Sequence, residues 1–130
     1  MTSPVIPVLI YEDIEAAHDQ LVTVFGFASD GIERLPDGTV IHAEVRLGDA
    51  RIWLHRVSDD LASPSTLTHL NAGLVVHVAD VDAHFARARE GGASIDNEPQ
   101  DQPYGQREYG ARDREGHHWW FSQRLRNPKT

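Results

Sequence analysis

The chain has 130 residues, a length that suits one domain with a substantial hydrophobic core. Hydrophobic residues make up 40% of it and charged residues 25%, which is a globular composition and argues against disorder. The formal net charge is −8, and no Lys/Arg cluster interrupts that acidity. Nucleic acid and anionic membranes are therefore excluded as expected partners, and a cationic small ligand is favoured, although acidity also serves solubility.

The sequence contains no cysteine, which excludes disulfide scaffolds, thiolate zinc sites and cysteine nucleophiles. The first ten residues have neither a basic flank nor a long apolar run. We therefore expect neither a signal peptide nor a transmembrane helix. A cytoplasmic protein is the default expectation.

Apolar runs and turn residues predict the elements of the first half. Asp13 is expected to cap a helix whose apolar residues recur at helical spacing and which ends at Gly26. Three β-branched or alternating segments are predicted strands, namely Val5–Tyr11, Thr39–Leu47 and Arg51–Arg56. A polar stretch containing Pro64 predicts a connection over about residues 58–70.

The second half repeats the pattern of the first. Asp80 offers the next helix N-cap, and Gly91 and Gly92 end that helix. The predicted strands are Leu74–Val78 and segments 93–98, 106–112 and 117–123. The shift along the chain that takes Asp13 to Asp80 also superimposes the last predicted strand of each half. We infer an internal duplication with the order β-α-β-β-β in each half, module one at about residues 4–57 and module two at about 71–124.

Several motifs in both halves resemble those of a known superfamily. They are Val8 to Ala17, Phe25-Gly26-Phe27, Val76 to Ala83, Gly92-Ala93, Tyr104 to Glu108 and Asp113 to His117. Arg114 stands where that family usually has proline. On these motifs the chain is similar to the vicinal-oxygen-chelate superfamily of glyoxalases, bleomycin-resistance proteins and extradiol dioxygenases over about residues 5–123. The resemblance implies a single α+β domain, in which two tandem βαβββ modules form a curved mixed sheet around a cavity with helices outside, and a homodimer.

Catalytic members of this superfamily share a metal site whose ligands come from the first and the last strand of each module. The resemblance places the ligand positions at Ile6 and Trp53 in module one, and at Gly73 and Trp120 in module two. None of these four residues can ligate a divalent ion, which needs imidazole or carboxylate groups. We therefore expect no metal and no other cofactor.

Side chains alternate across a sheet, so strand parity separates two faces. The face with Ile52, Leu54, Trp119 and Phe121 is apolar and is expected to pack under the helices. The opposite face, to which Val75 also belongs, carries both aromatic and polar side chains. This mixture is typical of small-molecule cavities. The ligand-binding candidates are Trp53, Trp120, His42, Glu44, Arg51, His55, His77, Tyr109, His118 and Ser122. The indoles of Trp53 and Trp120 are expected to be the principal contacts, by stacking on a planar ring or holding a cation.

These observations favour a metal-free protein that sequesters a planar or cationic small molecule, such as an antibiotic, without transforming it. An enzyme of the lyase, isomerase or dioxygenase type stays open. It would use His42, His55, His77 and His118 as metal ligands, or a histidine or Glu44 as general base. A protein whose only role is dimerisation is the third possibility.

A few polar residues outside this face also have two readings. Arg107 either reaches an anionic group of a ligand or pairs with a neighbouring carboxylate at the surface. The remaining histidines, His18, His69, His84 and His117, are expected to be solvated.

Overall fold

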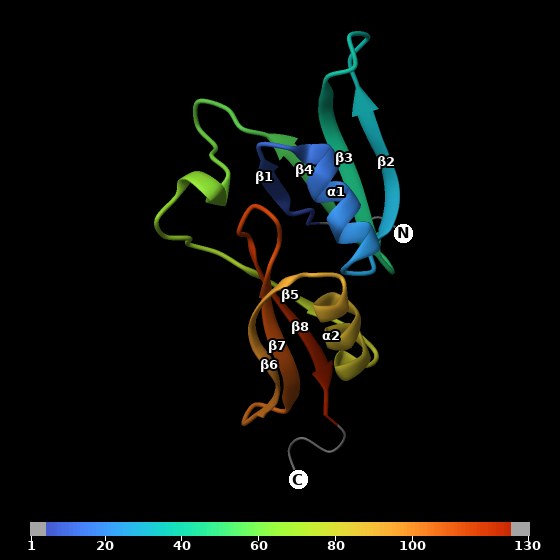
Figure 1. Ribbon diagram of the computed structural model, residues 1–130, viewed down its shortest axis with the longest axis vertical. Helices are drawn as coiled ribbons and strands as arrows, with labels where there is room; N and C mark the ends of the chain where they lie inside the picture. The colour runs from blue at the N-terminus through green and yellow to red at the C-terminus, as the bar shows by residue number, and fades with distance from the viewer. Residues whose placement is uncertain (1–4, 126–130) are drawn as a thin grey trace. The chain divides into compact units, whose positions relative to one another are not determined.

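The computed structural model describes residues 5–125, and the chain divides into two units at residues 69 and 70. Each unit contains one four-stranded mixed sheet and one α-helix (Figure 1). The predicted α+β class with two tandem βαβββ modules is confirmed. The single curved sheet of the expectation is instead two separately hydrogen-bonded sheets, because the strands pair within each module.

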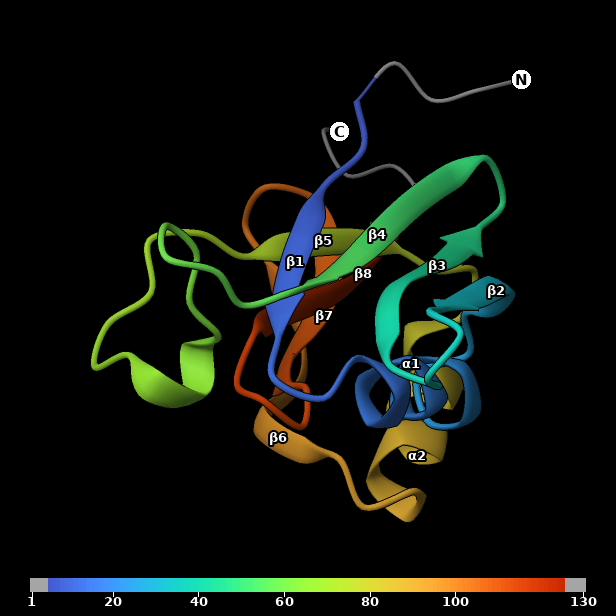
Figure 2. The same cartoon turned by 90° about the horizontal axis from the view of Figure 1, so that it is seen from above.

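Module one folds as a helix laid against one face of its sheet. Its elements are β1 (Val8–Tyr11), α1 (Ile14–Thr23), β2 (Ala28–Arg34), β3 (Val40–Leu47) and β4 (Ala50–Arg56). The strand order is β1-β4-β3-β2, with β1 parallel to β4 and the other pairs antiparallel. The carboxylate of Asp13 accepts the Ala16 N–H at 3.0 Å, so Asp13 caps α1 as predicted. Figures 1 and 2 show α1 against the sheet, where it contacts β2, β3 and β4.

Module two has the same plan. Its elements are β5 (Leu74–His77), α2 (Val81–Glu90), β6 (Ser94–Gln102), β7 (Gln106–Arg112) and β8 (His118–Arg124), in the sheet order β5-β8-β7-β6. A short 3-10 helix, η1 (Pro64–Thr66), lies in the connection between the modules. The carboxylate of Asp80 accepts the Ala83 N–H at 3.1 Å and caps α2. Beneath α2, the rings of Trp119 and Phe121 lie 6.0 Å apart and are both fully buried.

The sequence repeat holds in the backbone pairing as well. The shift that takes Asp13 to Asp80 also takes both ends of α1 to the ends of α2. Val8 pairs with Trp53 across β1 and β4, and Val75 pairs with Trp120 across β5 and β8. The two modules can therefore be compared position by position along their strands.

The outer strands are the elements that the sequence indicated least well. β2 was implied by the repeat but has no apolar run of its own, because it is a polar edge strand. Its pairing with β3 shifts register between Ser29 and Ile32, where Gly31 has a φ of 114°. β6 extends to Gln102, beyond the predicted segment 93–98, and includes Pro99, which an edge strand tolerates.

Two of the histidines expected to be solvated have side-chain partners instead. His18 is buried, and its Nε2 lies 2.7 Å from Oγ of Ser29. The Nδ1 of His84 lies 2.6 Å from Oη of Tyr109. Both imidazoles thus join a helix to the sheet beneath it.

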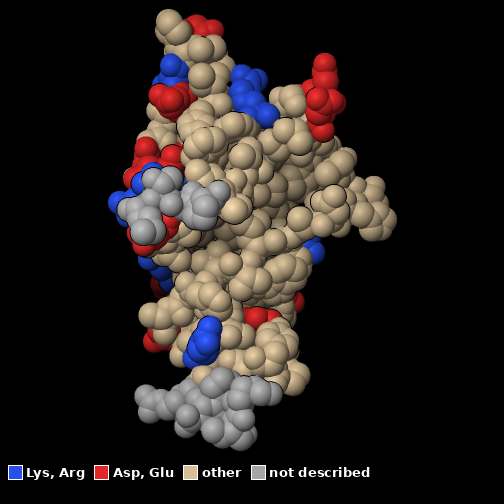
Figure 3. Space-filling view, turned by 180° about the vertical axis from the view of Figure 1, so that it is seen from behind, with Lys and Arg blue, Asp and Glu red and all other residues tan. Residues whose placement is uncertain are grey.

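None of the helices in the described chain is long and apolar enough to cross a membrane. On the face drawn in Figure 3, basic side chains stand singly or beside acidic ones and do not gather into a stripe. A nucleic-acid footprint is typically such a stripe or patch.

Candidate functional site

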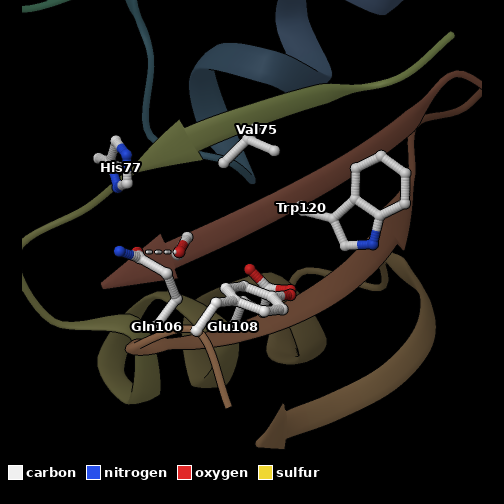
Figure 4. A pocket seen from close by; sticks show the side chains of 7 residues that line it. Val75, His77, Gln106, Glu108 and Trp120 are labelled. Atoms are coloured by element: carbon white, nitrogen blue, oxygen red, sulfur yellow. Dashed lines mark hydrogen bonds between the residues drawn. The ribbon is translucent and has the colours of Figure 1, made fainter. Parts of the chain in front are cut away.

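A cavity of about 570 Å³ opens on the face of the module-two sheet that α2 does not cover (Figure 4). This volume is in the range of small-molecule sites, roughly 300–1,000 Å³. The lining side chains are Val75 and His77 of β5, Trp120 and Ser122 of β8, Gln106 and Glu108 of β7, and Tyr104 of the preceding turn. We call this space the module-two cavity.

Strand register explains why the space exists. One row across the sheet contains Val75, Trp120 and Gly110, and the next row contains His77, Ser122 and Glu108. Gly110 and Val75 therefore flank the indole along its row, and Ser122 lies beside it in the next row. Ser122 is fully buried, and its hydroxyl donates a hydrogen bond of 2.7 Å to Oε1 of Gln106, the dashed line in Figure 4. The buried hydroxyl of Ser122 thus has its hydrogen-bond partner within the protein.

Trp120 forms one end of the cavity and lies against a glycine. A Cβ atom added at Gly73 would come within 2.5 Å of Cζ3 of Trp120 and 3.1 Å of the His118 carbonyl oxygen. The His118 ring covers the indole at a centroid distance of 4.0 Å. Gly73 and His118 together fix the position of the indole.

This contact gives Gly73 a testable role. We expect Gly73→Ala to displace the Trp120 indole and to weaken the binding of a planar ligand several-fold. The unfolding free energy should change by only about 1 kcal/mol, because Gly73 is exposed and its clash is with a partly exposed side chain. Near-ultraviolet circular dichroism reports the indole and urea denaturation the stability. Ala72→Ser is the neighbouring control, and an unchanged indole spectrum in Gly73→Ala would contradict the role.

Glu108 provides the carboxylate of the cavity, and a tyrosine holds it. The Tyr104 hydroxyl donates a hydrogen bond to Oε1 of Glu108. This bond, followed by desolvation and by the charge of Glu108, raises the pKa of Tyr104. No Lys or Arg is among the seven lining residues. The cavity therefore carries a carboxylate with a neutral partner.

Module one gathers its five predicted residues, His42, Glu44, Arg51, Trp53 and His55, on the equivalent face. The Glu44 carboxylate accepts the Trp53 indole N–H at 3.0 Å and an Arg51 N–H at 2.5 Å. The His55 ring stacks on the Trp53 indole with ring centroids 6.0 Å apart. The His42 ring meets the same indole edge-on, at a centroid distance of 5.3 Å. The indole of module one is thus surrounded by its own neighbours.

Positions that match by register differ in size between the modules. Glu44 lies opposite Trp53, where Gly110 lies opposite Trp120. His55 corresponds to Ser122, since each follows its tryptophan by two residues on the last strand. Ser122 therefore leaves space that His55 fills in module one. The space over Gly110 is filled by Asn97, whose Oδ1 would lie 2.8 Å from a Cβ atom added at Gly110.

Comparison with known proteins gives this two-module architecture a family. The profile of the Glyoxalase/Bleomycin resistance protein/Dioxygenase superfamily matches residues 5–121. The chain belongs to this superfamily. An uncharacterized protein of Mycobacterium bovis is 32% identical over 125 residues, covering 92% of this chain and 82% of that protein.

Two solved structures of the superfamily resemble the chain over nearly its whole length. TioX from Micromonospora sp. ML1 is 35% identical with a TM-score of 0.76, covering 95% of this chain and 99% of that one. TnmS3, an antibiotic binding protein from Streptomyces sp. CB03234, is 25% identical with a TM-score of 0.72, covering 95% and 97%. Both likenesses extend across both modules.

The metal of catalytic superfamily members does not fit the residues at its implied positions. In module two one implied position holds the indole of Trp120, and this ring packs against the backbone of the other position, Gly73. In module one the Trp53 indole N–H, a donor, is bonded to Glu44. Among residues 5–125, no three His, Asp or Glu side chains come together as a metal would require.

The histidines of the alternative metal set have other surroundings. His42 and His55 face each other across β3 and β4 with ring centroids 5.0 Å apart. Burial, and then the nearby His42, lower the pKa of His55. The His118 ring lies tilted against Trp120, and its Nε2 is 3.2 Å from Oδ2 of Asp96. Burial is the largest of the effects that lower the pKa of His118. His77 stands on β5 at the edge of the module-two cavity.

The prediction that Tyr109 lines the cavity is wrong. Tyr109 is fully buried on the helix side, where it stacks on Phe121 at 5.4 Å and bonds His84. Burial also raises the pKa of its phenol. The parity of β7 is the reason: since Glu108 faces the cavity, the next residue faces α2.

Sequence reasoning missed three lining residues, Tyr104, Gln106 and Glu108. They belong to a motif that the sequence analysis singled out, and the alternation of Gln106 and Glu108 along β7 was the signal that could have placed these two. Arg107, between two of them, points to the other side. It pairs with Asp82 at 3.0 Å and Asp101 at 3.1 Å, which is the surface pairing that sequence analysis allowed.

Proposed function

We propose that the protein binds a planar small molecule, of the kind found among antibiotics, in the module-two cavity and leaves it chemically unchanged. The observation that carries the proposal is an indole, Trp120, forming the wall of a ligand-sized cavity at a position where catalytic relatives hold a metal ligand. A flat, partly exposed indole offers a stacking surface to a planar ring. The similarity to TnmS3, an antibiotic binding protein, supports this class of ligand.

The face of module one has a different part in this proposal. Trp53 remains a proposed ligand contact together with its neighbours His42, Glu44, Arg51 and His55. Their mutual hydrogen bonds and ring contacts make this group a preformed surface on its own module. In module two the proposed contacts are Trp120, His77, His118 and Ser122, and we add Glu108 and Tyr104 because they line the cavity.

We also propose that the protein acts as a cytoplasmic homodimer. The superfamily resemblance supports the dimer, and so do exposed apolar side chains such as Leu61 and Leu67 in the connection. Sedimentation velocity at micromolar concentration tests the dimer, and a monomer there would contradict it.

The function is tested by binding and by recovery of the ligand. We expect planar drugs of the acridine, phenanthridinium and anthraquinone types to quench tryptophan fluorescence in a saturable manner. Protein treated with a chelator should bind as well as untreated protein. Mass spectrometry after prolonged incubation should recover the ligand unchanged. Absence of saturable binding across the panel would contradict the proposal, and conversion of the ligand would favour the enzyme instead.

A further inference from the structure

We propose that Glu108, held in place by Tyr104, makes the module-two cavity selective for planar ligands that carry a positive charge. The inference rests on the proposed function and adds to it the charge of the ligand. It also assigns a specificity-determining role to a residue outside the metal-ligand positions of the superfamily.

The geometry places the carboxylate within reach of a ligand stacked on the indole. Glu108 pairs with Ser122, and Gly110 pairs with Trp120. Glu108 and Trp120 are therefore diagonal neighbours on one face of adjacent strands, at a spacing of about 7–8 Å between backbones. Figure 4 shows Glu108 and Trp120 on the same side of the sheet, bordering one space. A planar cation lying on Trp120 would bring its charge to Glu108.

In the part of the chain that the structure describes, no arginine or lysine pairs with the Glu108 carboxylate. Within residues 5–125 Glu108 forms no ion pair, and the two arginines of β7 pair elsewhere. Arg107 pairs with Asp82 and Asp101, and Arg112 pairs with Asp96. A half-buried carboxylate without a cation attracts one more strongly than a fully solvated carboxylate does, because the local dielectric is lower.

Module one shows the contrasting arrangement. Its carboxylate, Glu44, bonds Arg51 at 2.5 Å, so its charge is already compensated. At the position of Glu108, module one has His42, since His42 pairs with His55 as Glu108 pairs with Ser122. Of the two equivalent faces, only the face with the open cavity has a carboxylate without an ion-pair partner.

Tyr104 supplies a neutral hydrogen-bond donor rather than a charge. Its hydroxyl bonds one carboxylate oxygen, Oε1, which fixes the side chain and leaves its negative charge in place. The Tyr104 ring also lines the cavity. Tyr104 is therefore a positioning residue for Glu108, and Tyr104→Phe should reduce charge selectivity while keeping the ring surface.

The experiment compares three acridines of similar size and different charge at pH 7.5: cationic 9-aminoacridine, neutral acridine and anionic acridine-9-carboxylate. Calorimetry and tryptophan quenching measure their dissociation constants. We expect the wild-type protein to bind the cation about tenfold more tightly than neutral acridine, and the anion most weakly. In Glu108→Gln the advantage of the cation should disappear, while neutral acridine binds within about twofold of wild type. Raising the salt concentration should weaken binding of the cation most.

A matched control separates the site from the general acidity of the protein. Glu90→Gln removes the same charge from an exposed position at the end of α2 and should leave all three affinities unchanged. Binding of neutral acridine without preference for the cation would overturn the charge inference and leave the proposed function standing. Equal losses in Glu90→Gln and Glu108→Gln would do the same. Failure of every acridine to bind the wild-type protein would overturn both.

Discussion

Replacing Trp120 by alanine is expected to weaken the binding of a planar ligand at least tenfold. Stacking on an indole contributes about 1 kcal/mol beyond area burial, and a cation held over it contributes up to about 2 kcal/mol. A loss of about 1.4 kcal/mol corresponds to a factor of ten in the dissociation constant. Because Trp120 is partly exposed at the end of the cavity, the fold should survive its removal. Trp120→Phe keeps a smaller ring and should lose less.

The measurement is calorimetric titration of each variant with a planar ligand that binds the parent, with urea denaturation to verify folding. Trp53→Phe is the matched variant in module one. Its effect should be smaller, because the Trp53 N–H is bonded to Glu44 and its ring is flanked by His42 and His55. If Trp120→Ala and Trp120→Phe bind as tightly as the parent, the indole is not the ligand contact.

Asp113→Ala is expected to destabilise the protein by about 3–5 kcal/mol, the range for a broken buried polar network. The Oδ1 atom of the buried Asp113 accepts the backbone N–H groups of Glu115, Gly116 and His117 at 3.0–3.2 Å. Its Oδ2 atom accepts the indole N–H of Trp119 at 3.1 Å. Alanine would remove the carboxylate that these four donors share in the turn that begins β8, although the Gly116 N–H would keep the Asp113 carbonyl at 3.0 Å.

Urea denaturation followed by circular dichroism measures the loss. Asp113→Asn keeps one acceptor oxygen but turns donors toward either the turn or Trp119, so an intermediate loss is expected. Asp59→Ala makes the same replacement at an exposed position and should change the unfolding free energy by less than about 0.5 kcal/mol. A loss below about 1 kcal/mol in Asp113→Ala would show that the turn does not depend on this carboxylate.

The fold could be predicted because its determinants are local and are repeated. Asp13 and Asp80 cap their helices as expected, and the repeat that they mark sets the same strand pairing in both modules. The repeat implied β2, but its position in the chain escaped prediction because its residues are polar and its ladder contains a bulge. An edge strand has few apolar contacts to mark it in the sequence.

The site was harder to predict because it depends on register between strands. Parity within β8 placed Trp120 and Ser122 on the cavity side and Trp119 in the core, as the structure does. In β7 the run Glu108-Tyr109-Gly110 gives one face a carboxylate and a glycine and the other face a tyrosine. Neither face is clearly apolar, so the sequence did not show which one packs under α2, and Tyr109 was misplaced. That Gly110 lies beside Trp120 depends on how β7 pairs with β8, which composition and periodicity do not specify.

The alternation along β8 has an evolutionary consequence. Trp119 and Phe121 hold α2 to the sheet, while Trp120 and Ser122, their immediate neighbours, face the opposite way. Substitutions at Trp120 change what a ligand meets without loosening the first pair, whereas the fully buried Ser122 accepts only residues of similar size. Descendants of one ancestral chain could in this way exchange ligands by a few replacements on one side of a strand while inheriting an unchanged scaffold. Binding preference can therefore change while thermodynamic stability is retained, because the residues responsible for each are adjacent in the sequence but lie on opposite faces of the strand.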